Sequence, residues 1–163
     1  MRQKSFPSDS LNKIIALFFT MLAQHYEHHF NSNPIINRSI IRATMTEQTI
    51  FDKLIRKEIP SKIVYEDEFV FAFRDIAPVA PTHILIIPKN KDGLTGLSKA
   101  EERHEAILGK LMVAAAKIAK QEGLEKGYRI VINDGEHAGQ TVFHLHVHLL
   151  GGKEFSWPPG TSL

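Results

Sequence analysis

The sequence has no cysteine among its 163 residues. Disulfide bonds are therefore excluded, and so is any zinc site that uses cysteine ligands. Long apolar runs are also missing. The longest run, residues 14–23, is apolar except for Thr20 and falls well short of the roughly 20 residues that cross a bilayer. We therefore expect no transmembrane helix and no membrane partner.

A strong excess of one charge is missing as well. The 20 Lys and Arg residues nearly balance the 18 Asp and Glu residues, which gives a net charge of +2. Residues 1–45 alone balance at +3, so the remainder of the chain is near −1. Because nucleic-acid binding depends on positive charge facing phosphates, the near-neutral remainder argues against broad binding to nucleic acid.

Residues 1–45 differ in composition from the rest, so we divide the chain into an N-terminal extension (1–45) and one domain (46–163). A basic start, a short apolar centre and few acids suit a secretory signal or an organellar transit peptide. The alternative is a non-native or mispredicted extension that adds nothing to the fold, with Met45 as the start. We expect an intracellular, cytoplasmic protein, or an organellar one, for instance mitochondrial, if the extension is a transit segment.

From Thr46 onward the pattern predicts a short helix, three strands, a long helix and two strands. Apolar pairs four residues apart predict the first helix, which Pro60 ends. Ser98 and Glu101 match a capping box at the start of the long helix, and Gly123 ends it. Strands are predicted at residues 62–66, 69–74, 83–87, 128–133 and 144–150. Short links and a single long helix favour an α+β domain with an antiparallel sheet.

Three histidines alternate with apolar residues near the end of the chain. In a strand, His144, His146 and His148 share one face, while the intervening Leu145, Val147 and Leu149 share the other. A solvated polar face is one interpretation. A zinc site is another, but the outer two histidines are about 13 Å apart along a strand, so one ion could take two of them plus a remote ligand rather than all three. We favour nucleotidyl transfer, in which a neutral imidazole attacks phosphorus near pH 7.

The His-x-His-x-His-x-x pattern resembles the signature of the histidine triad (HIT) family of nucleotide hydrolases and transferases. The segments 73–78, 80–83, 133–141 and 157–160 resemble its Hint branch, and the resemblance covers about residues 49–160. It implies a HIT-like α+β fold with a five-stranded antiparallel sheet per protomer, one long helix and one short N-terminal helix. It also implies a homodimer joined through the long helix and a neighbouring strand. Some relatives bind zinc through Cys-x-x-Cys near the start of the domain; here that stretch reads Thr49-Ile50-Phe51-Asp52, so we expect no metal and no cofactor.

The resemblance also implies roles for individual residues. His146 would be the nucleophile, and His148 would bind the phosphate or the leaving group. His144 and His83 would fix orientation from behind, the alternative for His83 being a buried core histidine. Because no aspartate lies close to His146 in the sequence, we expect a backbone carbonyl to hold its other ring nitrogen. Asp75 would accept the ribose hydroxyls, its alternative role being a turn cap. The further residues proposed to bind the nucleotide are Ile50, Phe51, Leu54, Phe73, Ile76, Leu85, Asn133, Gly139, Gln140 and Thr141, of which Thr141 also assists catalysis.

The function implied is that of a purine nucleoside phosphoramidase. It would cleave the P–N bond of adenosine 5′-monophosphoramidate-type substrates through a nucleotidyl-histidine, binding AMP, GMP or their conjugates. One alternative is a nucleotide-binding interaction module with little catalysis, and another is a dinucleoside polyphosphate hydrolase. Two departures from the family pattern bear on specificity: Arg74 stands where histidine is common in animal members, beside the ribose site, and residues 161–163 extend the tail.

Overall fold

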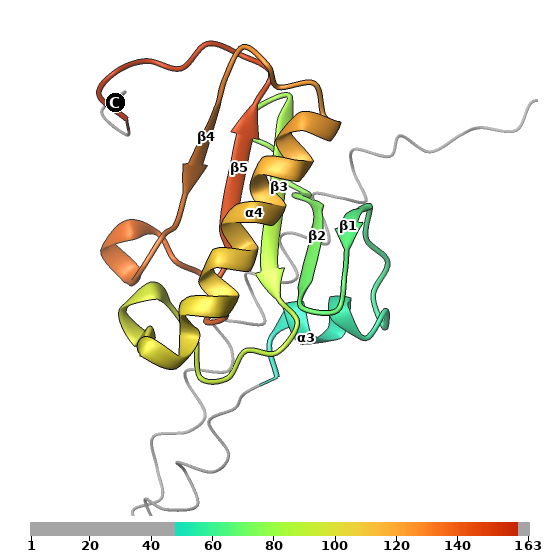
Figure 1. Cartoon of the computed structure of the whole chain (residues 1–163), viewed down its shortest axis with the longest axis vertical. Helices are drawn as coiled ribbons and strands as arrows, with labels where there is room; N and C mark the ends of the chain where they lie inside the picture. Colours follow the sequence, from blue (N-terminus) through green and yellow to red (C-terminus); the bar gives the residue numbers. More distant parts are fainter. Residues whose placement is uncertain (1–47, 160–163) are drawn as a thin grey trace, which may run out of the picture. The chain divides into compact units, whose positions relative to one another are not determined.

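The computed structural model describes residues 48–159. Its five strands form one antiparallel sheet in the order β1-β2-β3-β5-β4, which confirms the predicted sheet (Figure 1). The strands are β1 (Ile63–Glu66), β2 (Val70–Arg74), β3 (Thr82–Pro88), β4 (Tyr128–Val131) and β5 (Val147–Gly151), and the α-helices are α3 (Ile50–Ile55) and α4 (Glu105–Gln121). The predicted extension and the last four residues lie outside the described residues, so the boundary at residue 45 stays a prediction.

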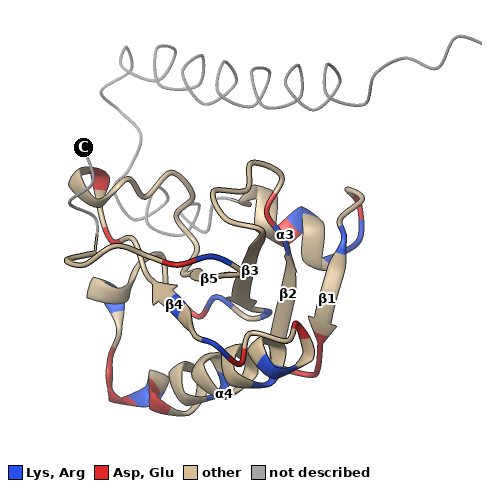
Figure 2. Ribbon diagram, turned by 90° about the horizontal axis from the view of Figure 1, so that it is seen from above, with Lys and Arg blue, Asp and Glu red and all other residues tan. Residues whose placement is uncertain are grey.

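The two faces of the sheet carry separate apolar clusters. On one face, α4 packs along the strands (Figure 2). There Leu111, Ala115 and Ile118 share one apolar cluster with Ile84 and Leu149. The other face has a smaller cluster built around Phe51, Leu54, Phe71, Phe73, Leu85 and Ile87. Strand β3 is buried along its whole length, as its continuous apolar run predicts. No helix within residues 48–159 is long and apolar enough to cross a membrane.

Helix α3 is shorter than the helix predicted between Thr46 and Pro60. Thr49 caps it: the Asp52 backbone N–H donates to the Thr49 hydroxyl, and the Thr49 backbone N–H donates to the Asp52 carboxylate. The helix ends where Lys57 takes a positive φ of 60°, which a helix cannot continue. Its buried residues, Phe51 and Leu54, are three positions apart and face the sheet.

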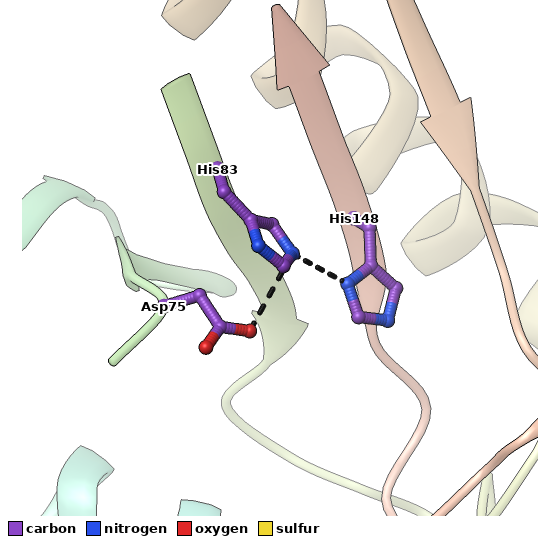
Figure 3. Close-up of side chains that lie close together, drawn as sticks. All are labelled: Asp75, His83 and His148. Carbon is purple, nitrogen blue, oxygen red and sulfur yellow. Dashed lines mark hydrogen bonds and ion pairs between the residues drawn. The ribbon is translucent and has the colours of Figure 1, made fainter. Parts of the chain in front are cut away.

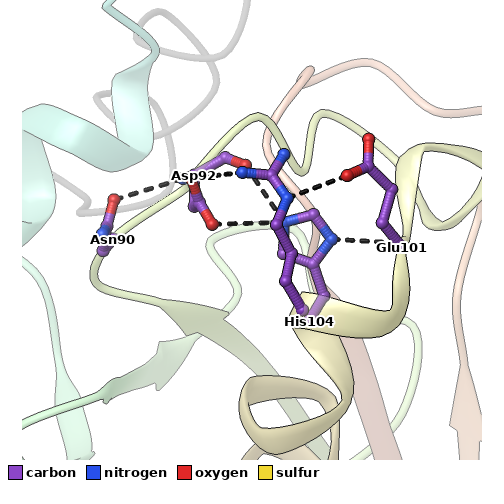
Figure 4. Close-up of polar contacts among 5 residues, drawn as sticks. Asn90, Asp92, Glu101 and His104 are labelled. Atoms are coloured by element: carbon purple, nitrogen blue, oxygen red, sulfur yellow. Dashed lines mark hydrogen bonds and ion pairs between the residues drawn. The ribbon is translucent and has the colours of Figure 1, made fainter.

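The long helix starts later than predicted. Ser98 does not cap it, because the Ser98 backbone N–H and hydroxyl donate to Asp134 instead. Two 3₁₀ turns, Leu97–Lys99 and Glu102–His104, come first. The buried imidazole of His104 accepts from the Glu101 backbone N–H at 3.0 Å and donates to the Asp92 carbonyl at 3.1 Å, which closes the start of α4 (Figure 4). Gly123, with φ +68°, follows its end as predicted.

The histidine strand is also shorter than predicted, because β5 begins only at Val147. The preceding residues do not join the sheet ladder; the Leu145 N–H donates to the Leu94 carbonyl instead. The alternation of faces nevertheless continues through this segment. Leu145, Val147 and Leu149 enter the α4 cluster, and the histidines lie on the opposite side.

Candidate active site

Four histidines gather on the face of the sheet that α4 does not cover. His148 lies in β5 and His83 in the neighbouring β3, where their ring centroids are 5.2 Å apart. The ring of His146 lies 5.0 Å from that of His148. Phe51 of α3 sets its ring edge against His146 at 5.3 Å and against His144 at 5.8 Å. The sheet and α3 therefore bring together all four histidines predicted for the site.

His146 is held in one orientation by the backbone. Its Nδ1 lies 2.8 Å from the carbonyl oxygen of His144, which can only accept, so Nδ1 carries the hydrogen. This confirms the predicted backbone partner. In the neutral ring the lone pair is then on Nε2. His146 is buried, with 6% of its surface exposed.

A chain of hydrogen bonds assigns the ring protons of His83 and His148 (Figure 3). The Val79 backbone N–H donates to Nδ1 of His83 at 3.3 Å, so the hydrogen of neutral His83 is on Nε2. That nitrogen donates to Nδ1 of His148 at 2.9 Å. Neutral His148 therefore carries its hydrogen on Nε2, a buried atom without a partner among the described residues. The site thus presents a lone pair on His146 beside an N–H on His148.

Burial keeps these rings neutral. Burial, followed by the neighbouring His146 and His83, lowers the pKa of His148 to about 4, against an opposing effect of Asp75. Burial likewise lowers the pKa of His83, against an opposing effect of Asp75. At neutral pH, His148 is therefore a neutral hydrogen-bond donor and not an imidazolium ion.

His144 is fully buried and supports the site from behind. Its Nε2 donates to the Pro88 carbonyl at 2.9 Å, and its own carbonyl holds His146. Its Nδ1 has no hydrogen-bond partner among the described residues, and Oδ1 of Asp52 lies 3.9 Å from it. Burial lowers the pKa of His144, so this nitrogen is an acceptor that faces another acceptor. The sequence analysis did not predict that Asp52 lies beside His144. Its spacing of three residues from Thr49, which is that of a capping box, was the available signal.

Asp75 follows β2 and has two separate contacts. Its Oδ1 accepts from the Ala77 N–H at 2.8 Å, which is the turn-capping role weighed above. Its Oδ2 lies 3.4 Å from Nε2 of His83. The ribose role predicted for Asp75 therefore remains a prediction, and the carboxylate adds negative charge behind the His83–His148 pair.

Asp75, His83 and His148 are also the one group among residues 48–159 whose spacing could suit a metal ion, with ligand atoms within 4.8 Å of one another. Ligand atoms around tetrahedral zinc are about 3.3 Å apart, since Zn–N bonds are about 2.0–2.1 Å. The 2.9 Å between His83 and His148 is too short for this and suits a hydrogen bond. A zinc-bound neutral His83 would also carry its hydrogen on Nδ1, where the Val79 N–H already points. The residues as arranged do not fit zinc.

The predicted base-binding residues are mostly core. Phe51, Leu54, Phe73 and Leu85 are at most 8% exposed and form the apolar cluster beside the histidines, with Ile50 packed against it. Ile76 is 69% exposed on the loop after Asp75. Thr141 and Gly139 are exposed, and Asn133 is half-buried. Gln140 is buried and bonded to backbone groups.

Arg74 does not face the histidines. Its Nη2 donates to both carboxylate oxygens of Glu122, at 2.9 and 2.7 Å, at the end of α4. Because side chains alternate along β2, Phe73 points to the histidine side and Arg74 to the helix side. The expected effect of Arg74 on ribose or base preference is therefore not supported by its position.

Comparison with known proteins gives a consistent set of matches. The family model described as HIT domain matches residues 56–155. Over 112 residues the chain is 71% identical to the "14 kDa zinc-binding protein" of Zea mays, covering 69% of this chain and 88% of that protein. It is 65% identical to "Adenylylsulfatase HINT1" of Arabidopsis thaliana (69% and 76% covered) and 54% identical to "Purine nucleoside phosphoramidase" of Escherichia coli (67% and 91% covered). A solved HIT family hydrolase of Legionella pneumophila superimposes with a TM-score of 0.66 at 44% identity, covering 69% of this chain and all of that one.

Proposed function

The chain belongs to the HIT domain family, and from this premise we propose that it hydrolyses the P–N bond of purine nucleoside 5′-phosphoramidates. The products are the nucleoside monophosphate and a free amine. The named relatives support a nucleotide hydrolase in the broader sense. The observation that carries the proposal is the bond from Nδ1 of His146 to the carbonyl of His144, which leaves the Nε2 lone pair for attack on phosphorus.

The reaction proceeds in two balanced steps. Nε2 of His146 forms a bond to phosphorus while the P–N bond breaks, and the leaving amine takes a proton from water, which leaves hydroxide. Hydroxide then attacks phosphorus and the His146–phosphorus bond breaks, which releases the nucleoside monophosphate and returns neutral His146. The Nε2–H of His148 hydrogen-bonds to the leaving nitrogen and stabilises the negative charge that develops there, and it keeps its proton, because a neutral ring that lost it would be an imidazolide anion. The Val79–His83–His148 chain supports this role, because it keeps the hydrogen of the neutral ring on Nε2 of His148.

A second substrate class deserves the same assay, because one relative is named an adenylylsulfatase. Adenylyl sulfate would transfer its adenylyl group to the same nitrogen of His146. Sulfate leaves as an anion and needs no proton, whereas an amine does. The two substrates therefore share the nucleophile and differ in their need for His148.

The test is steady-state hydrolysis of adenosine 5′-phosphoramidate by the full chain, with and without EDTA. We expect release of AMP that EDTA does not reduce. Loss of activity in EDTA that added zinc restores would contradict a metal-free mechanism, and the zinc-binding name of one relative makes this arm informative. Binding of AMP with no turnover of either substrate would favour a nucleotide-binding interaction module. Turnover of dinucleoside polyphosphates alone would favour a dinucleoside polyphosphate hydrolase.

A further inference from the structure

Gln140 has its entire side-chain amide directed into the protein. It is 7% exposed, and its Oε1 accepts from the Gly135 N–H at 2.9 Å. Its Nε2 donates to the Thr95 carbonyl at 2.6 Å and to the Val142 carbonyl at 3.1 Å. These three bonds use both N–H donors of the amide and one of the two lone pairs of its oxygen. No N–H of this side chain is left to bind a phosphate oxygen.

The three partners of Gln140 belong to two segments: the loop that precedes the histidines and the loop that precedes α4. Gly135 and Val142 are the two ends of one loop, so a single side chain closes it. Thr95 lies in the loop before α4, 45 positions before Gln140. The neighbouring Leu94 carbonyl accepts the N–H of Leu145, which lies between His144 and His146.

The two loops are in such close contact at Gly96 that a larger residue does not fit there. A Cβ at this position would collide with the carboxylate of Asp134 and lie 3.1 Å from Oε1 of Gln140. Asp134 in turn accepts from the backbone N–H and hydroxyl of Ser98. The loop before α4 therefore acts as a fixed support for the loop that precedes the histidines.

We propose that Gln140 is a positioning residue: it fixes the 135–142 loop, which includes Gly139 and Thr141, relative to His146, and it does not itself contact the nucleotide. This inference rests on the proposed function for its catalytic consequence. The buried amide replaces the nucleotide contact that the sequence suggested for Gln140. Misplacement of a group by about 1 Å is enough to cost two orders of magnitude in rate.

The test compares Gln140→Glu with Gln121→Glu, the same change at an exposed position on α4. The carboxylate of Gln140→Glu can still accept from Gly135, but it loses both donors and sets an oxygen against two carbonyls. We expect kcat on adenosine 5′-phosphoramidate to fall at least 10-fold, while KM and the Kd for AMP change less than 3-fold. Gln121→Glu should leave all three unchanged.

Amide hydrogen exchange supplies a readout that does not need turnover. We expect faster exchange at Gly135 and Leu145 in Gln140→Glu, but wild-type exchange elsewhere in the sheet. If Gln140→Glu does not fold, Gln140→Asn replaces it, since it keeps the amide but is too short to reach all three partners, and the same pattern is expected in milder form.

Two results would overturn the inference: an unchanged kcat, or a Kd for AMP that rises as much as kcat falls, which indicates direct phosphate contact. If the wild-type protein turns over no phosphoramidate, the proposed function fails, and exchange at Gly135 and Leu145 still decides whether Gln140 fixes the loop.

Discussion

Nε2 of His83 donates to Nδ1 of His148 over 2.9 Å, and this contact determines what His148 offers a substrate. With Nδ1 occupied as an acceptor, the hydrogen of the neutral ring is on Nε2, which is buried without a partner among the described residues. A pKa lowered to about 4, mainly by burial, keeps the ring neutral. His148 is therefore prepared to donate one hydrogen bond to a group bound beside His146.

The first prediction separates the two substrate classes. His148→Ala removes the N–H that stabilises charge on the leaving amine, so cleavage of a phosphoramidate should fall at least about 10²-fold, the usual cost of losing one such donor. Cleavage of adenylyl sulfate should fall less than 10-fold, because sulfate is a stable anion that leaves without this help. The measurement is kcat/KM for both substrates with one enzyme preparation. Equal losses on the two substrates would show that His148 acts on the phosphate rather than on the leaving group.

The second prediction concerns acid stability. Burial lowers the pKa values of His83, His144 and His148, so between pH 6.5 and about 4 the unfolded chain binds more protons than the folded one. The free energy of unfolding should therefore fall as the pH drops through this window and should level off above pH 6.5. Urea denaturation at pH 4.5, 5.5, 6.5 and 7.5 measures this.

A matched variant assigns part of the slope. His148→Gln removes the histidine whose pKa is lowered to about 4. The glutamine in its place cannot be protonated in this pH range. Its stability should depend less steeply on pH between 4.5 and 6.5 than that of the wild type. The same slope in both proteins would mean that His148 is not desolvated in solution.

The third prediction concerns the acceptor pair formed by Asp52 and His144. Burial raises the pKa of Asp52, but hydrogen bonds from Thr49 outweigh this and leave it lowered, so the group is a carboxylate facing the unpartnered Nδ1 of His144. Asp52→Asn can keep the Thr49 cap through its oxygen and turn its NH₂ toward that nitrogen. We expect the Tm at pH 7.5 to be unchanged or raised.

The control is Asp52→Ala, which keeps the bond from the backbone N–H of residue 52 to the Thr49 hydroxyl but loses the carboxylate that accepts from Thr49, and supplies no donor. It should be destabilised by about 1 kcal/mol, the usual net contribution of a hydrogen bond. If Asp52→Asn and Asp52→Ala lose the same stability, the carboxylate itself stabilises His144 through its charge.

Much of the fold followed from local pattern. Alternation of apolar residues and histidines placed both sets on their correct faces, and turn residues separated the five strands. The starts of α4 and β5 were misplaced because long-range contacts decided them. Ser98 has the sequence of a cap but bonds to Asp134, and Leu145 donates to Leu94 instead of to a strand.

The residue types of the site could be predicted from the sequence, but most of the groups that hold the histidine rings in place could not. The histidines were identified from spacing, and the family resemblance assigned their roles. The partners that fix their ring protons are mostly backbone groups: the Val79 N–H and the carbonyls of Pro88 and His144. Every residue carries such groups, so they leave no mark in a sequence. Pro88 and His144 are 56 positions apart, and only the pairing of β3 with β5 brings their segments together.

The fourth prediction concerns assembly. Helix α4 turns Met112 and Val113, 39% and 55% exposed, away from its own sheet, and the edge strand β4 exposes Tyr128 at 41%. We propose that these residues lie in a homodimer interface, as an apolar surface of this kind favours. Sedimentation should show a dimer at micromolar concentration, and Val113→Glu should shift it toward monomer.

The matched control is Lys117→Glu, a charge change at another position of α4. It should leave the dimer intact if the interface depends on the apolar residues. A wild-type protein that sediments as a monomer at micromolar concentration would contradict the dimer.

The central claim is that Nε2 of His146 attacks phosphorus, and the most direct measurement is a search for the covalent intermediate. The protein is mixed with adenosine 5′-phosphoramidate, quenched in alkali because phosphohistidine-type bonds are acid-labile, digested and analysed by mass spectrometry. We expect one adenylyl group on the peptide that contains His146, fragment ions that place it on this residue, and no adduct in His146→Asn, whose turnover should be at least about 10³-fold lower. An adduct on another residue, or a His146→Asn variant that keeps more than about a tenth of wild-type turnover, would contradict the claim.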